Sequence, residues 1–372
     1  VSLRCTAAAG GGIPWLVNLE RCKRLAEMLK ARGIDAALIH RPENVRYLTG
    51  FTGEGSAFVC GDVIVVITDF RYVEQLSRQA PQAKLMQTMA GHRETDCALE
   101  LTDGCGVKTL AVETDFLSHD DFEALRVKLP FVQLVSLNGL VEELRLIKDA
   151  GEIESMCRSA EIASKAFENI LGRIHAGMTE REVQIMLDYE MLSLGSEGNA
   201  FDTIAAAGVN GSLPHAIPSE HVIAQGEMLT LDFGAKVNGY CSDMTRTVAF
   251  GKISPQLKEI YDLVYEAHMA ALQAVKPGVR CGALDKIARD IIDARFPGTF
   301  GHSLGHGVGL FIHEQPRVAS GCETVLRSGY VITIEPGVYI PGIGGCRIED
   351  MVILTSEGYI DPVTAPKQLI EL

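Results

Sequence analysis

The sequence predicts a two-domain protein in which an α/β domain precedes an α+β domain rich in strands. Its 372 residues suffice for about two domains of ordinary size. Up to about residue 140, short apolar runs typical of strands alternate with helix-favouring stretches. From Asp202 onward, strand-like segments dominate. We therefore assign the domains to 15–140 and 141–372, and expect residues 1–14 to be a disordered lead-in or a cloning remnant.

The elements of the first domain follow from apolar spacing. Residues 18–33 place apolar side chains on one helical face and stop at Gly33. Further helices are expected at 71–79 and 120–128. The expected strands are 36–40, 57–60, 63–68, 84–89, 109–113 and 131–136.

A long helix-favouring stretch, 141–174, opens the second domain, and we expect Arg145, Lys148 and Glu152 on its exposed face. Thr179 followed by Glu182 is a capping box, which predicts that a helix starts there and runs over 180–194. Two more helices are expected at 256–275 and 283–295, within the strand-rich part.

Two aspartates flank a predicted hairpin. Asn-Gly at 238–239 is the strongest short-range hairpin signal, because both residues tolerate the positive φ of its turn. If the residues beside this turn pair with each other, Asp232 lies opposite Thr245, and Asp243 is a diagonal neighbour of Asp232 at roughly 7–8 Å. Thr245 is then placed to orient a ligand carboxylate. Either aspartate alone is most simply an exposed strand residue, but adjacent carboxylates among apolar residues indicate one or two metal ions.

A second hairpin and a glycine-rich segment extend this set. With a turn centred on Gly342, Glu335 and Glu349 become cross-strand partners. Residues 301–313 hold three histidines among glycines, where backbone can approach a ligand closely. Four carboxylates with a histidine form an oxygen-rich set, which suits divalent ions such as Mn²⁺ better than thiolate-seeking metals.

With these features, the chain resembles the aminopeptidase P, prolidase and methionine aminopeptidase group of dinuclear metallopeptidases, which have the pita-bread fold. The similarity runs from about Leu144 to the C-terminus, and the upstream domain looks like the creatinase-like domain of the proline-specific members. The motifs that carry it are Asn210-Gly-Ser-Leu-Pro-His215, His302-Ser-Leu-Gly-His306-Gly-Val-Gly, Ile334-Glu-Pro-Gly and Arg347-Ile-Glu-Asp350. The family's metal ligands, in chain order, match Asp232, Asp243, His306, Glu335 and Glu349.

The resemblance implies a role for each residue. Two divalent ions, with Mn²⁺ expected and Co²⁺, Fe²⁺ or Zn²⁺ as alternatives, would be bridged by a hydroxide that attacks the carbonyl before proline. Glu335 would transfer the proton to the leaving nitrogen. His215 and His313 would stabilise the tetrahedral intermediate. His302 and Arg347 would line the substrate pocket, Arg347 either by direct contact or by supporting the ligands. Without the resemblance, each of these histidines is most simply an ordinary loop residue.

The implied function is that of an Xaa-Pro aminopeptidase acting on peptides with proline at the second position. An Xaa-Pro dipeptidase (prolidase) is the alternative. A methionine aminopeptidase is disfavoured, because those enzymes are mostly a single catalytic domain. Creatinase-like amidinohydrolases and a non-catalytic binding protein on this fold are disfavoured, because all five ligands are present. The resemblance also implies a homodimer built through the N-terminal domain.

Composition narrows the partners and the location. The formal charge of −14 argues against nucleic acid and anionic membranes as partners. The longest apolar run, at 63–68, is far too short to span a membrane. The N-terminal residues lack the layout of a signal peptide, and ten cysteines without a Cys-x-x-Cys pair are most simply reduced thiols. We therefore expect a cytoplasmic enzyme.

Overall fold

The computed structural model describes residues 14–372, with side chains from Asn18 onward. These residues divide into two compact units, 14–145 and 146–372. The expectation for residues 1–14 lies outside the described part of the chain, except that Pro14 begins the first helix. Within the described part, no helix combines the length and the apolar composition that crossing a membrane requires.

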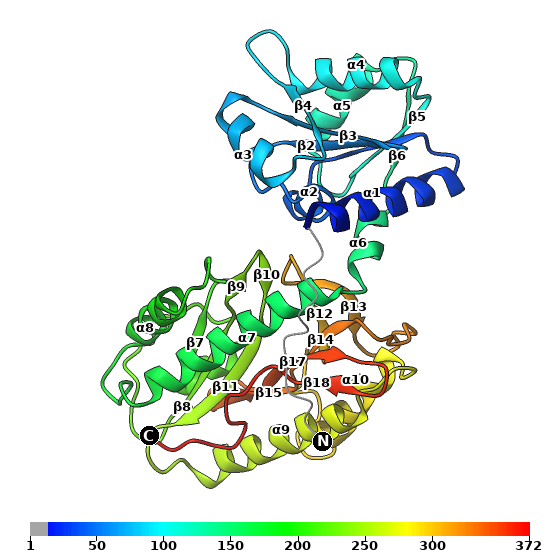
Figure 1. The fold of residues 1–372 in the computed structure, drawn as a ribbon. Helices are drawn as coiled ribbons and strands as arrows, with labels where there is room; N and C mark the ends of the chain where they lie inside the picture. The colour runs from blue at the N-terminus through cyan, green and yellow to red at the C-terminus, as the bar shows by residue number, and fades with distance from the viewer. Residues whose placement is uncertain (1–13) are drawn as a thin grey trace. The chain divides into compact units, whose positions relative to one another are not determined.

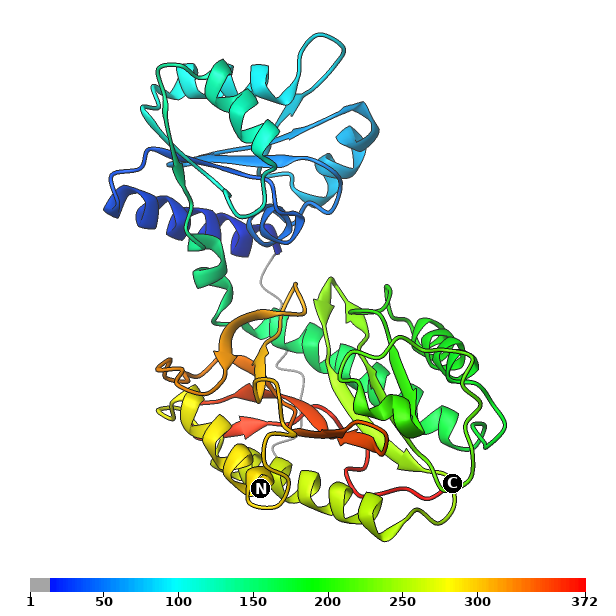
Figure 2. The ribbon, with the colours of Figure 1, turned by 180° about the vertical axis from the view of Figure 1, so that it is seen from behind.

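The first unit is a mixed sheet of six strands with helices on both faces (Figures 1 and 2). The six predicted strands are all present: β1 (Ala36–Ile39), β2 (Ser56–Cys60), β3 (Val63–Thr68), β4 (Lys84–Gln87), β5 (Thr109–Val112) and β6 (Gln133–Ser136). Their order in the sheet is β4-β3-β2-β1-β5-β6. On one face α1 (Pro14–Ala31) packs on β1 and β2, and on the other α4 (Glu94–Cys105) packs on β2 and β3 beside α5 (His119–Lys128).

The sequence patterns do not predict α4 or α2 (Pro42–Thr49). The signals for α2 are nevertheless present, because proline stands in its first turn and Gly50, with a φ of 83°, ends it. The expected helix at 71–79 is α3 (Val73–Gln79), preceded by the short helix η1 (Phe70–Tyr72).

The stretch expected as one helix over 141–174 is two helices, α6 (Leu140–Arg145) and α7 (Ala150–Leu171). The break lies before Asp149, whose carboxylate accepts a hydrogen bond from the Glu152 N–H at 3.0 Å and so caps α7. The division between the two units falls at the same break, after Arg145.

The expectation that Arg145, Lys148 and Glu152 are exposed is wrong, because all three are buried. Each has a polar partner that offsets the loss of water. The Arg145 Nη1 donates to Asn44 Oδ1 at 2.7 Å, and Glu152 accepts from the Tyr240 hydroxyl at 2.8 Å. Lys148 pairs with Glu314, with 3.1 Å between Nζ and Oε2. Helical spacing alone does not reveal such partners, since they come from residues distant in sequence.

The second unit is built on one large sheet in the order β13-β12-β14-β17-β11-β8-β7, with β18 beside β17. Besides α7, its α-helices are α8 (Glu180–Ser193), capped by Thr179 as predicted, α9 (Pro255–Ala274) and α10 (Cys281–Asp293). The strands are β7 (Ile204–Ala207), β8 (Met228–Phe233), β9 (Lys236–Val237), β10 (Tyr240–Cys241), β11 (Met244–Ala249), β12 (Gly305–Gly307), β13 (Glu314–Val318), β14 (Val331–Ile334), β15 (Gly337–Ile340), β16 (Gly344–Arg347), β17 (Glu349–Leu354) and β18 (Tyr359–Ile360).

Two helix pairs pack on different strands of the second unit (Figure 1). α7 and α8 pack together, α8 on β7 of the large sheet and α7 on the separate two-stranded sheet of β9 and β10. α9 and α10 pack together on β13 to β16, and their apolar faces enclose the largest part of the core, including Ile260, Val264 and Leu284.

Both predicted registers are confirmed. Val237 lies opposite Tyr240, and Asp232 lies opposite Thr245 on β8 and β11. In the second hairpin Ile334 pairs with Asp350, so that Glu335, the next residue, faces Glu349.

The thiols follow the expectation with one exception. Eight of the described cysteines are free: Cys22, Cys60, Cys97, Cys105, Cys241, Cys281, Cys322 and Cys346. Cys157 is disulfide-bonded, so the expectation of reduced thiols throughout is wrong there.

Candidate metal centre

The candidate metal centre forms where three neighbouring strands align their polar residues. Thr245 on β11 pairs with Asp232 on one side and with Glu349 on the other. Asp243 lies just before β11, where the ladder with β8 is interrupted. Asp243 stands two residues before Thr245, so strand alternation turns its side chain to the same face as Thr245.

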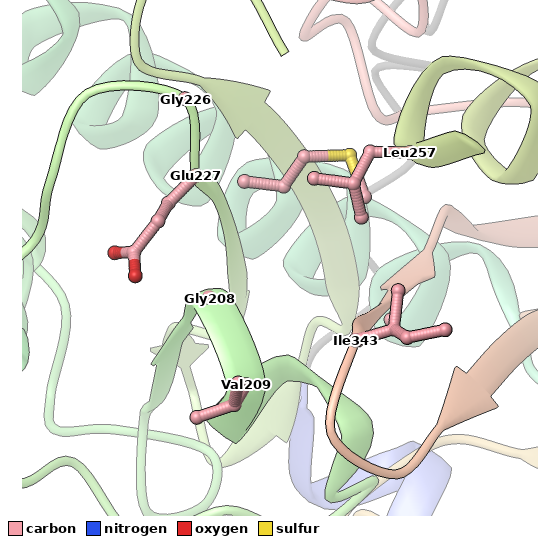
Figure 3. A pocket seen from close by; sticks show the side chains of 8 residues that line it. Gly208, Val209, Gly226, Glu227, Leu257 and Ile343 are labelled. Carbon is pink, nitrogen blue, oxygen red and sulfur yellow. The ribbon is translucent and has the colours of Figure 1, made fainter. Parts of the chain in front are cut away.

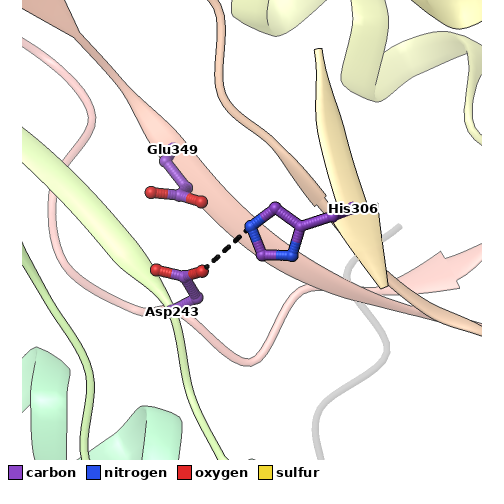
Figure 4. A group of neighbouring side chains, drawn as sticks. All are labelled: Asp243, His306 and Glu349. Atoms are coloured by element: carbon purple, nitrogen blue, oxygen red, sulfur yellow. Dashed lines mark ion pairs between the residues drawn. The ribbon is translucent and has the colours of Figure 1, made fainter. Parts of the chain in front are cut away.

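Asp243, His306 and Glu349 meet at one point, as Figure 4 shows. Each offers one ligand atom, and these atoms all lie within 4.8 Å of one another. The His306 Nε2 lies 3.5 Å from Asp243 Oδ2 and 3.4 Å from Glu335 Oε1. Its Nδ1 lies 3.0 Å from the Gly307 carbonyl oxygen. Because a carbonyl oxygen can only accept a hydrogen bond, Nδ1 carries the proton, and the lone pair of Nε2 is free to bind a metal.

The electrostatics of this cluster call for a cation. Burial, and then the neighbouring Glu349, Asp232 and Glu335, raise the pKa of Asp243 well above its ordinary value. Burial and the same crowding raise the pKa of Glu349 well above its ordinary value, and burial raises the pKa of Glu335 to about 8. Burial also lowers the pKa of His306 to about 4, so its imidazole is neutral at pH 7. Carboxylates that repel one another beside a neutral histidine fit divalent ions.

Asp232 gives an independent sign of a missing partner. Its Oδ2 accepts a hydrogen bond from Arg347 Nη2 at 2.5 Å. Its Oδ1 is buried and has no hydrogen-bond partner among the described residues. A buried carboxylate oxygen left in this way costs free energy unless an ion binds it.

Arg347 connects the ligands to a tyrosine that the sequence patterns did not single out. Besides Asp232, Arg347 donates to the Thr245 hydroxyl at 3.1 Å and to the Tyr339 hydroxyl at 2.8 Å. The Tyr339 hydroxyl in turn lies 2.9 Å from His302 Nε2. Strand alternation could have identified Tyr339, because it stands four residues after Glu335 and is therefore expected on the same face of the strand.

Thr245 orients the carboxylate of Glu349, its partner on β17, rather than that of Asp232, its partner on β8. Its hydroxyl donates to Glu349 Oε2 at 2.7 Å and accepts from Arg347 Nε. Thr333 plays a similar part for Glu335, donating to Oε1 at 3.1 Å. Hydrogen bonds of this kind fix the orientation of ligand carboxylates.

The remaining predicted histidines lie around the cluster. The ring centroid of His313 is 4.6 Å from that of His306, and His302 Nδ1 is 4.0 Å from Glu335 Oε2. His302 is half-buried, and burial lowers its pKa to about 4. His215 and His313 are exposed. Burial and then the charge of His215 lower the pKa of His313, so these two residues are within electrostatic range of each other.

The fold and these residues define a metal-dependent hydrolytic enzyme with an added N-terminal domain. The chain belongs to metallopeptidase family M24, whose model matches residues 154–356, and the creatinase/prolidase N-terminal domain matches residues 21–147. The pita-bread fold implied by the resemblance is confirmed, and the protein is a metallopeptidase that uses divalent metal ions.

Three relatives show how far the similarity extends. An Xaa-Pro dipeptidase from Bacillus anthracis has a structure that matches with a TM-score of 0.92 and 41% identity, over 95% of this chain and 100% of that one. An X-Pro aminopeptidase from Thermotoga maritima matches with a TM-score of 0.85 and 34% identity, over 91% and 98% of the two chains. An Xaa-Pro dipeptidase from Pyrococcus horikoshii is 37% identical, over 91% of this chain and 95% of its own length.

Proposed function

We propose that this metallopeptidase hydrolyses the peptide bond that precedes proline. The observation that carries the proposal is the convergence of Asp243, His306 and Glu349 within 4.8 Å, with Asp232 and Glu335 beside them. Relatives that match over nearly the whole chain are named Xaa-Pro dipeptidases and an X-Pro aminopeptidase. A peptide bond before proline lacks an N–H, so its hydrolysis needs a dedicated pocket.

We propose that Asp232, Asp243, His306, Glu335 and Glu349 hold two divalent ions, most simply Mn²⁺. When bound, such ions bring the pKa of water close to neutrality and polarise a carbonyl oxygen. Glu335, which lies beside the ligand histidine His306, would accept a proton from the attacking water and pass it to the departing nitrogen.

The other predicted residues act on the substrate or on the ligands. His215 and His313, exposed at the edge of the cluster, donate hydrogen bonds to the oxyanion as it forms. His302 lines the pocket beside Glu335. For Arg347, burial and its hydrogen bonds to Asp232 and Tyr339 favour support of the ligands over direct substrate contact.

Substrate length separates the two candidate activities. The aminopeptidase expected from the sequence cleaves tripeptides and longer chains, whereas the relatives from Bacillus anthracis and Pyrococcus horikoshii are named dipeptidases. Hydrolysis of an Xaa-Pro dipeptide and of an Xaa-Pro-Xaa tripeptide should be assayed in parallel. Activity on the dipeptide alone assigns the prolidase function, and activity on the tripeptide assigns the aminopeptidase. Hydrolysis of neither peptide by metal-loaded protein contradicts the proposed function.

Metal dependence is tested in the same assay. After exhaustive chelation we expect no hydrolysis, and we expect Mn²⁺ or Co²⁺ to restore it. Full activity of a protein in which elemental analysis finds no metal would contradict the ligand assignment.

We further propose a cytoplasmic homodimer assembled through residues 15–140. The N-terminal unit exposes Phe70, Val127 and Phe131 by 72–90%, and its residues supply no ligand to the metal centre described above. Eight of the nine described cysteines are free thiols, which supports a reducing compartment, whereas the disulfide at Cys157 counts against it. Light scattering that shows an active monomer at micromolar concentration contradicts the dimer.

A further inference from the structure

A buried carboxylate outside the metal centre lies under the segment that carries His215. Glu180, the first residue of α8, is only 1% exposed. Its side chain faces residues 207–219, which lead from strand β7 through the short helix η2 (Gly208–Ser212) to His215 and beyond. We call residues 208–219 the His215 segment.

The Glu180 carboxylate holds this segment at both ends. Oε1 accepts from the Ala207 N–H at 2.7 Å and from the Asn210 amide at 3.1 Å. Oε2 accepts from the Ser219 N–H at 3.0 Å and from the Ser219 hydroxyl at 2.6 Å. All of these partners are donors, so an ionised carboxylate, which only accepts, fits this position.

The backbone of α8 adds to the same attachment. The Arg181 N–H donates to the Ser219 carbonyl at 3.1 Å, and the Glu180 N–H donates to the His221 carbonyl at 3.1 Å. These N–H groups have no partner inside the helix, since they belong to its first turn. α8 itself is fixed by its buried residues Val183, Leu187 and Met191.

Apolar packing anchors only part of the His215 segment. Ala216 is buried against Ile204 and Ala206, and Pro218 is buried as well. In contrast, Val209, Leu213 and Ile217 are 51%, 56% and 81% exposed. On the side of η2, Gly208 and Val209 line a cavity of about 160 Å³ together with Leu257 and others, as Figure 3 shows. Polar contacts therefore add to a small apolar anchor in fixing the position of the segment.

The contacts on the opposite side lead to the metal centre. The backbone of Gly211 approaches that of Gly345 so closely that a Cβ on Gly211 would lie 3.2 Å from the Gly345 nitrogen. Arg347, two residues further along β16, donates from Nη1 to the Pro214 carbonyl at 3.2 Å. His215 thus stands between one attachment to α8 and another to the arginine that binds Asp232.

We infer that Glu180 is a positioning residue that sets the placement of His215 and, through it, the rate of hydrolysis. The inference rests on the proposed role of His215 as a donor to the oxyanion. Its alternative is a carboxylate that stabilises the fold without affecting turnover.

The test is a double-mutant cycle with Glu180→Gln and His215→Ala in the full-length, metal-loaded protein. The amide presents an NH₂ group to donors, so Glu180→Gln should lower kcat by about tenfold or more while KM and metal content change little. In the His215→Ala background the same substitution should have almost no effect, because the residue it positions is gone. Glu168→Gln, exposed on the neighbouring helix α7 and paired only with Lys165, is the matched control and should leave kcat unchanged.

Hydrogen exchange gives a readout that needs no substrate. Glu180→Gln should speed exchange in residues 208–219 and not on β11 or β17. If Glu180→Gln proves unstable, Ser219→Ala, which removes one donor, should shift exchange and kcat in the same direction by less. Unchanged exchange and kcat, or an equal loss of kcat with and without His215, overturns the inference. Absence of Xaa-Pro hydrolysis by the wild type refutes the proposed function instead, and exchange still shows whether Glu180 holds the segment.

Discussion

The proposed metal ligands and the histidines that we propose to face the substrate are held in different ways. Asp243 and Glu349 are 4% and 1% exposed and lie on or beside strands whose pairing fixes their positions. His215 and His313 are exposed and lie on connections between strands. The contrast teaches that carboxylates that repel one another must be held rigidly on buried strands. Histidines that contact a changing substrate must instead be accessible from solvent. Substitutions on the strands should therefore change metal content, and those on the connections should change turnover with the metals retained.

The largest effect is expected from Asp243→Ala. Loss of a residue that only hydrogen-bonds to a ligand costs up to roughly 100-fold in activity. Loss of the ligand Asp243 itself should reduce kcat/KM by well over that factor, and elemental analysis should find less metal. The metal-loaded form should unfold at a lower temperature, whereas the chelated mutant, with one repelling carboxylate fewer, should match or exceed the chelated wild type. Asp262→Ala, which removes only an exposed pair with Lys258, is the control. Unchanged metal content and turnover would show that the hairpin does not hold the metal.

The next largest effect is expected from His313→Ala. Removal of one oxyanion donor should lower kcat by about 100-fold with the metal content unchanged. His175→Ala replaces another exposed histidine and should have no effect. If His313→Ala instead loses metal, His313 belongs with the ligands, and the contrast between strands and connections fails at this residue.

A smaller effect is expected from Thr245→Val. The change keeps the side-chain shape but leaves Glu349 Oε2 without its donor and Arg347 Nε without its acceptor. Metal affinity should fall towards the lower end of the roughly 10–100-fold range for such partners, as measured by titration with a competing chelator. Thr230→Val, which removes a bond to Thr247 in the same sheet, should leave the affinity near that of the wild type.

The smallest effect concerns pH. The pKa of Glu335 is raised to about 8, so folded, metal-free protein holds a proton that the unfolded chain releases, and this stabilisation is lost as pH rises through about 8. The pKa values of His302 and His306 are lowered, so these residues make the folded protein more stable as pH rises. Their contribution to the free energy of unfolding no longer changes above the ordinary histidine pKa. The chelated protein should therefore lose Tm between pH 6.5 and 8.5 more steeply than Glu335→Gln. Equal slopes would show that Glu335 is not the group responsible.

The part of the site that lies on strands could be predicted from the sequence. The Asn238-Gly239 turn fixes the register that places Asp232 opposite Thr245, and the turn around Gly342 fixes the register of the second hairpin. Turn chemistry acts over a few residues and strand alternation extends it, so local patterns suffice for each hairpin. The pairing of Thr245 with Glu349, which joins the two hairpins, does not follow from these patterns.

The contacts made between distant segments could not be predicted. Glu180 and Ser219 are brought together by the path of the chain after β7, and no local pattern encodes that path. The burial of Lys148 depends on Glu314, which lies far away in sequence. Helix periodicity assigns such charged residues to the surface, because it is blind to partners elsewhere in the chain.

One buried arginine bears on the order in which the protein matures. Arg246 donates from its guanidinium to the Glu349 carbonyl at 2.6 Å and also to the carbonyls of Ala365 and Pro366, each at 2.9 Å. During synthesis Asp232 and Asp243 emerge from the ribosome more than 100 residues before those carbonyls. Loop closure over such separations is slow. We therefore expect metal capture to come at the end of biogenesis, and nascent chains arrested before residue 365 should bind Mn²⁺ more weakly than released ones.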